Sequence, residues 1–128
     1  MKTPVLYNSD LHFEHEQWRG ELLFWEDELK SFTIRLEELV MRWTDKNVLA
    51  QLEHFQNAFI RHSEVIDELK HDINVHETNM SQHNKKHEEV LNTSLVKSHI
   101  EFRDKMETQR HIYGDLKKEF FRYLSKYM

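Results

Sequence analysis

The chain has 128 residues, which suits a single domain (1–128), and its 18 basic and 23 acidic side chains give a formal net charge of −5. Two glycines and one proline are too few turn-forming residues for a β protein. The absence of cysteine excludes disulfides and thiolate metal sites, and a net acidic protein is poorly suited to binding phosphates, so we expect no nucleic-acid partner.

The N-terminal residues lack the apolar core of a signal peptide, and no stretch approaches the ~18 apolar residues of a membrane span. A chain without cysteine also fits a reducing compartment. We therefore expect a cytoplasmic protein with no membrane partner.

Apolar residues recur at steps of three and four along residues 9–43, which predicts an amphipathic α-helix that begins near Ser9 and Asp10. Its stripe comprises Leu11, His15, Trp18, Leu22, Trp25, Leu29, Phe32, Leu36, Leu39 and Trp43. A second helix is predicted over about 46–78, with Thr44 and Asp45 as its N-cap. The stripe of this second segment comprises Val48, Leu52, Phe55, Phe59, His62, Ile66, Leu69, Ile73, His76 and Met80.

Residues 79–86 are polar and rich in helix-capping types, so we predict a turn there, followed by a third helix over about 85–127. The third stripe comprises Leu91, Leu95, His99, Phe102, Met106, Gln109, Tyr113, Leu116, Phe120, Tyr123 and Tyr127. An alternative is one helix of roughly eighty residues that pairs with a second chain, because the spacing could continue through Met80, His83 and His87. The change of phase near Leu91 favours the turn.

These elements predict an all-α fold, an up-down-up antiparallel bundle of three long helices with coiled-coil-like packing. The connection between the first two helices is so short that they must be antiparallel neighbours. Charge is distributed unevenly along this bundle. Residues 1–77 have a balance of −8, whereas residues 103–128 have a balance of +3.

Histidines occupy several stripe positions at which leucine or phenylalanine is expected. Folding the helices up-down-up places His15, His76 and either His83 or His87 in one layer near the turn between the second and third helices. Three helices that each contribute an imidazole could hold zinc or another transition metal and leave an open position. The sequence therefore raises the hypothesis of a transition-metal site in this layer.

His62 and His99 fall at similar heights about halfway along the predicted bundle, opposite Trp25, and form a weaker candidate for metal binding. A simpler interpretation covers all the inward histidines. A buried imidazole can satisfy itself with a neighbouring carboxylate or hydroxyl, and two imidazoles can form a hydrogen-bonded pair. On this interpretation the histidines are structural, and the protein needs no cofactor.

The end of the third helix carries more aromatic surface than a solvated helix end normally shows. The residues concerned are Phe120, Phe121, Tyr123, Leu124 and Tyr127. They can close the bundle over Trp43 and Val48, or they can bind a protein partner. Further apolar residues lie off the stripe of the first helix and favour a homodimer, namely Phe13, Leu23, Phe24, Ile34 and Met41.

Motifs for catalysis are missing from the sequence. It contains no Gly-x-Ser-x-Gly motif and no glycine-rich phosphate loop, and its stripes lack the glutamates of a di-iron bundle. We therefore predict a non-enzymatic helical bundle that acts in protein interaction or self-assembly. The alternative is a bundle that binds or senses a transition metal through its histidine layer.

Overall fold

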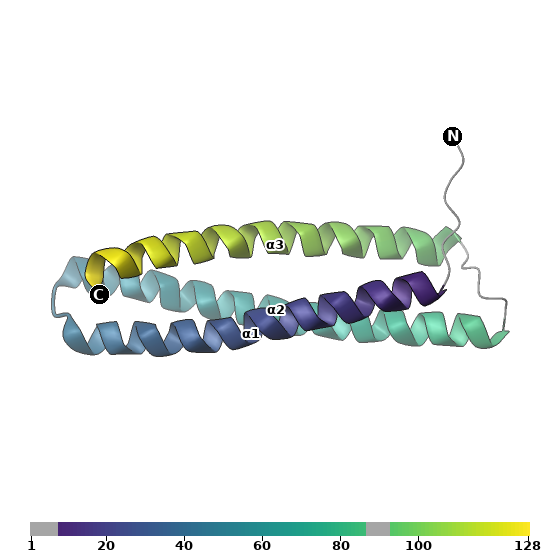
Figure 1. The fold of residues 1–128 in the computed structure, drawn as a ribbon, viewed down its shortest axis with the longest axis horizontal. Helices are drawn as coiled ribbons and strands as arrows, with labels where there is room; N and C mark the ends of the chain where they lie inside the picture. Colours follow the sequence, from purple (N-terminus) through teal and green to yellow (C-terminus); the bar gives the residue numbers. More distant parts are fainter. Residues whose placement is uncertain (1–7, 87–92) are drawn as a thin grey trace, which may run out of the picture.

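The computed structural model describes residues 8–86 and 93–128, and it confirms the predicted all-α bundle (Figure 1). Three helices make up almost all of this part of the chain: α1 (Asn8–Arg42), α2 (Lys46–Lys86) and α3 (Thr93–Tyr127). α2 runs antiparallel to α1, and α3 returns beside them in the direction of α1. The C-terminus therefore lies at the end of the bundle where α1 connects to α2 (Figure 1).

A tight connection joins α1 to α2, as the sequence predicts. The Asp45 carboxylate accepts hydrogen bonds from the backbone N–H groups of Asn47 and Val48, at 2.8 and 3.2 Å. In this N-cap arrangement a side-chain oxygen satisfies amides that have no partner within the first helical turn. The predicted N-cap is thus confirmed, with Asp45 as the capping residue.

The turn predicted at residues 79–86 is wrong, because α2 continues through this segment to Lys86. The segment contains neither glycine nor proline to end a helix, and Met80 is buried against Leu11 of α1, so burial favours continued helix. α3 begins at Thr93, later than predicted. The alternative of one continuous helix is also wrong, since α2 and α3 are separate helices packed against each other. Leu91 lies outside the described residues.

The predicted stripes form the core of the bundle. Leu22, Ile66 and Met106, one from each helix, are completely buried, and the main apolar cluster runs along all three helices. Burying one large apolar side chain stabilises the fold by about 1.5–3 kcal/mol, so the stripes supply most of the driving force. A few stripe residues are only half-buried, namely Trp43, His76, Leu95 and Tyr127.

Ion pairs with a constant spacing of seven residues join α1 to α3. The pairs are Glu14–Arg103 at 2.9 Å, Glu21–Arg110 at 2.8 Å and Glu28–Lys117 at 2.6 Å. Residues seven apart lie on the same side of a helix, so two parallel helices in register repeat the same contact. This ladder, which the sequence analysis did not predict, closes one flank of the α1–α3 boundary.

A double-mutant cycle can measure what this ladder contributes to stability. Replacing Glu21 and Arg110 with glutamine, singly and together, is expected to give a coupling energy of about 0.2–1 kcal/mol, because both side chains are partly exposed to water. The coupling should fall when salt screens the charges. Urea denaturation at low and high salt measures both effects. A coupling that does not change with salt would contradict an electrostatic role.

Candidate functional site

A layer of three imidazoles, one from each helix, lies in the half of the bundle away from the α1–α2 connection. The His15 ring centroid lies 5.0 Å from that of His99 and 6.0 Å from that of His76. His15 and His99 are completely buried, whereas His76 is half-buried. Trp18 stacks on His99 with the ring centroids 5.0 Å apart, so an aromatic ring covers one side of the layer.

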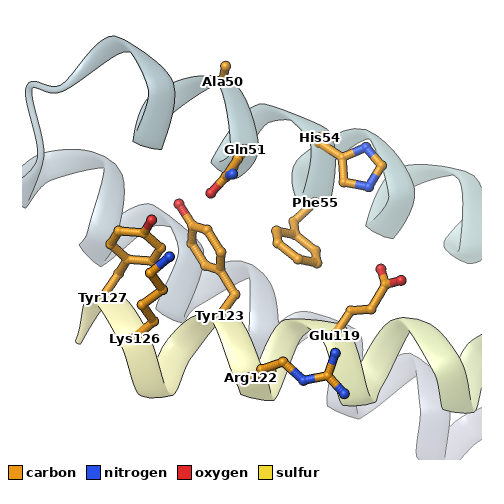
Figure 2. A pocket seen from close by; sticks show the side chains of 9 residues that line it. All are labelled: Ala50, Gln51, His54, Phe55, Glu119, Arg122, Tyr123, Lys126 and Tyr127. Atoms are coloured by element: carbon orange, nitrogen blue, oxygen red, sulfur yellow. The ribbon is translucent and has the colours of Figure 1, made fainter.

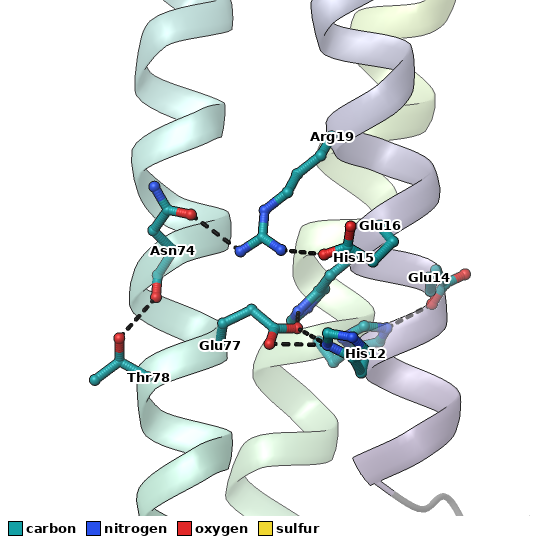
Figure 3. Close-up of polar contacts among 9 residues, drawn as sticks. His12, Glu14, His15, Glu16, Arg19, Asn74, Glu77 and Thr78 are labelled. Atoms are coloured by element: carbon teal, nitrogen blue, oxygen red, sulfur yellow. Dashed lines mark hydrogen bonds and ion pairs between the residues drawn. The ribbon is translucent and has the colours of Figure 1, made fainter.

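Each of the two buried imidazoles of this layer is held on one side by a glutamate. Figure 3 shows His15 with Glu77. His15 Nδ1 lies 2.6 Å from Glu77 Oε1, and His99 Nε2 lies 2.5 Å from Glu14 Oε1. Both glutamates have a second partner. Arg103 donates two hydrogen bonds to Glu14, and His12 Nδ1 lies 3.0 Å from Glu77 Oε2.

Within the described residues, the opposite nitrogens of these two rings have no hydrogen-bond partner. A carboxylate only accepts hydrogen bonds, so the proton of neutral His15 is on Nδ1 and that of neutral His99 is on Nε2. This leaves His15 Nε2 and His99 Nδ1 as buried acceptors without a hydrogen-bond donor in the described part of the chain. Such an acceptor costs about 1–3 kcal/mol, which a proton, a water molecule or a metal cation would relieve.

Burial determines the direction in which the pKa values of the two buried histidines shift. It lowers the pKa of His15 and His99, and the hydrogen bonds that these rings donate to Glu77 and Glu14 oppose this effect without reversing it. Burial alone would raise the pKa of the two glutamates, but their hydrogen-bond partners, led by Arg103 for Glu14, lower it. The layer is therefore neutral imidazole beside ionised carboxylate at neutral pH.

The layer differs in one member from the layer that the sequence predicts. His15 and His76 lie together as predicted, but the third helix contributes His99 in place of His83 or His87. His83 belongs to α2, and its side chain lies outside the described residues, as does the whole of His87. The later start of α3 explains the difference, because it changes which α3 residues reach this height.

The predicted pairing of His62 with His99 is also wrong, because the later start of α3 changes which α3 residue lies beside His62. His62 Nδ1 accepts a hydrogen bond of 2.8 Å from the Gln109 amide, and its ring packs against Tyr113. The buried His62 ring is therefore satisfied inside the core, as the structural interpretation of the histidines expects.

No ready-made metal site is present among the side chains of residues 9–82 and 94–128. In these ranges no three histidine or acidic side chains are grouped so that they could hold a metal ion. The metal hypothesis stays a prediction, and His15, His76 and His99 are the residues to which it now applies.

The aromatic residues at the end of α3 mostly pack inside the bundle. Phe120 is completely buried, and Tyr123 is buried and donates a hydrogen bond of 3.1 Å to the Val48 carbonyl. Leu124 and Tyr127 are half-buried against the core, and only Phe121 is exposed. The end of α3 therefore closes the bundle, and the partner-binding role of these five residues stays a prediction.

Hollows lie at both ends of the boundary between α2 and α3. A cavity of about 470 Å³ lies near the C-terminus and is lined by aromatic and charged side chains (Figure 2). Its lining residues are Ala50, Gln51, His54, Phe55, Glu119, Arg122, Tyr123, Lys126 and Tyr127. Two further cavities, of about 420 and 250 Å³, follow the same boundary towards the histidine layer.

Sequence reasoning missed several residues of the candidate site. Glu14 and Glu77 each lie next to an inward histidine in the sequence, but only the packed helices show which ring each carboxylate binds. The ion-pair ladder between α1 and α3 could have been predicted from the sequence. Acidic residues recur every seven positions in the first helix, and basic residues do the same in the third, which is typical of paired parallel helices.

Comparisons with known proteins do not assign the chain to a family. No family model matches the chain, and neither the curated proteins nor the solved structures contain a significant match. In the part of the chain that the structure describes, no helix combines the length and the apolar character needed to cross a membrane.

Proposed function

We propose that this protein is a non-enzymatic helical bundle that acts by association, with a second copy of the chain as its first partner. The observation that carries the proposal is the open α2–α3 boundary. Three cavities lie at this boundary and no ion pair bridges it within the described residues, whereas ion pairs bridge α1 to both α2 and α3, with one cavity of about 390 Å³ beside the α1–α3 ladder.

The contrast between the boundaries is clear in their ion pairs. The seven-residue ladder bridges α1 and α3, and Lys70 binds Glu26 across α1 and α2 at 3.0 Å. Within the described residues no ion pair joins α2 to α3. The direct hydrogen bonds between these two helices, such as that between Gln109 and His62, lie in the buried interior. Apolar side chains that line this open boundary, such as Phe55 and Tyr127, favour association with another surface.

Exposed apolar side chains support the same proposal. Ile60 on α2 and Ile112 on α3 are 54% and 48% exposed, and Phe24 and Met41 on α1 are 59% and 89% exposed. Single exposed apolar residues are common on soluble proteins, but a set of large ones on a small bundle favours a partner.

Measuring the oligomeric state of the chain tests the proposed self-association directly. Light scattering of the full chain during size-exclusion chromatography is expected to give the mass of a dimer at micromolar concentration, with dissociation on dilution. A chain that stays monomeric at every concentration up to its solubility limit would overturn self-association.

A second candidate function, transition-metal binding, rests on one specific observation. His15 Nε2 and His99 Nδ1 are buried acceptors without donors, and a carboxylate binds the opposite nitrogen of each ring. Histidines that ligate metals are commonly oriented by a carboxylate in this way. His76 is the third imidazole within reach of the layer.

Metal titration tests this candidate. Zinc that binds only the folded chain should raise the melting temperature, because it stabilises by about 2.7 kcal/mol at a hundredfold excess over its dissociation constant. The upward shift should shrink in His76→Gln and persist in the exposed control His54→Gln. Untagged protein that contains no metal by elemental analysis and shows no thermal shift with zinc, nickel or copper rules out this function.

A further inference from the structure

The open α2–α3 face carries opposite charge at its two ends. Near the C-terminus, Arg122 and Lys126 line the cavity of about 470 Å³, with Glu119 as its single acidic residue (Figure 2). Towards the histidine layer, the second cavity is lined by an excess of acidic side chains. They are Glu68, Asp72, Glu101 and Asp104, against one basic residue, Lys105.

The charges at these two ends are not neutralised across the face. In the described part of the chain neither Arg122 nor Glu68 has an ion-pair partner, and both are exposed. The ammonium group of Lys126 lies over the Tyr127 ring, 5.2 Å from its centroid, and not on a carboxylate. Each end of the face can therefore bind a surface of opposite charge.

Smaller apolar residues lie between the two charged ends. Val65 lines the second cavity, and Ala58 precedes it by seven residues, so both lie on the same side of α2. On α3, Ile112 follows Lys105 by seven residues and is 48% exposed. The face thus has a basic end and an acidic end about 30 Å apart at the 1.5 Å rise of a helix, and the residues between them include Ala58 and Ile112 as well as exposed polar residues such as Arg61 and Asp115.

We propose that a second copy of this chain docks on the α2–α3 face in antiparallel orientation, related to the first copy by a two-fold axis midway between the two charged ends. This inference rests on the self-association proposed above and specifies its surface. A two-fold axis brings the same patch of both copies together, and it places the basic end of each copy on the acidic end of the other. A parallel arrangement would instead oppose like charges, which costs free energy.

Charge reversal of the two ends tests this geometry. The first variant combines Arg122→Glu with Lys126→Glu, and the second combines Glu68→Lys with Glu101→Lys. All four side chains are exposed and none belongs to the core, so both variants should keep the helical circular dichroism of the natural chain. Each variant alone should dimerise at least roughly tenfold more weakly, because each of its two charged contacts becomes repulsive.

An equimolar mixture of the two variants is the decisive measurement. In a mixed dimer the end of the first variant that has become acidic lies on the end of the second variant that has become basic. The unchanged acidic end of the first variant lies on the unchanged basic end of the second. Dimerisation of the mixture should therefore return to the level of the natural chain. The control, Asp27→Lys with Glu37→Lys on the exposed surface of α1, changes the net charge as the second variant does and should dimerise normally.

The outcomes separate this inference from the proposed function. If the natural chain dimerises and both charge variants do so equally well, the surface is wrong while self-association stands. If each variant is monomeric and the mixture is monomeric as well, the antiparallel two-fold arrangement is overturned. A natural chain that is monomeric throughout overturns the inference and self-association together.

Discussion

Replacing Phe120 with alanine is expected to lower the free energy of unfolding by about 3–5 kcal/mol, because the ring is completely buried where all three helices meet. Its centroid lies 5.3 Å from Phe32 on α1, and 5.3 and 4.9 Å from Phe55 and Phe59 on α2. Truncation would leave a cavity that three rings border, and long helices joined by short connections cannot easily collapse to fill it. Urea denaturation followed by circular dichroism gives the value.

The neighbouring residue supplies a matched control. Phe121 is 45% exposed and its ring makes an edge contact with Phe32, so Phe121→Ala should cost roughly 1 kcal/mol or less. Equal losses for the two alanine variants would show that the end of α3 does not pack as described here. The comparison also indicates which side chain at this end is free to contact a partner.

Acidification is expected to destabilise the bundle as the pH falls below about 6.5, the ordinary pKa of histidine. Burial lowers the pKa of His15 and His99 in the folded chain, so the unfolded chain binds more protons in this range. The stability that these histidines contribute is therefore complete above about pH 6.5 and is lost below it. The free energy of unfolding, measured in urea at a series of pH values, should decrease accordingly.

Charged groups on all three helices surround this layer. Glu14 and Glu77 favour a protonated imidazole, whereas Arg103, beside His99, and the neighbouring imidazoles oppose it. Asp72 and Lys105 act in opposite directions on His76, the pKa of which burial also lowers. A second acidic step should follow near the ordinary glutamate range, because the pKa of Glu14 and Glu77 is lowered and their contribution disappears on protonation.

Substitution of His15 and His99 tests whether these two imidazoles cause the loss of stability below about pH 6.5. The double variant His15→Leu with His99→Leu should show a flatter dependence of stability on pH between about 6.5 and 5. His54→Gln, which removes an exposed imidazole, should keep the natural slope. A double variant that loses stability with pH as steeply as the natural chain would place the titrating groups elsewhere.

Most of the fold could be predicted because helical periodicity depends on local spacing. The steps of three and four identified residues that the structure buries, including Gln109 and His99, which residue type alone would place outside. The cap at Asp45 also follows from a local hydrogen bond. The end of α2 was less predictable, because polar residues such as those at 79–86 fit a solvated helix as well as a turn.

The partners within the candidate site could not be predicted, for a physical reason. Sliding one helix past another by seven residues leaves the same stripe facing inward, so the pattern does not determine which side chains share a layer. The stripe pattern alone therefore does not decide whether His15 lies beside His83, His87 or His99. Contacts outside the stripe, such as Glu14 with Arg103, restrict the alignment, and they become visible only when the helices are packed.

The amino-acid sequence by itself determined that this chain forms three long helices and which face of each is buried, because both depend on spacing within one segment. Only the tertiary structure decided that His15, His76 and His99 share a layer, that Glu14 and Glu77 hold two of these rings, and that the α2–α3 boundary stays open. These features depend on the axial alignment of separate helices, which α2 sets by extending to Lys86 before the chain reverses.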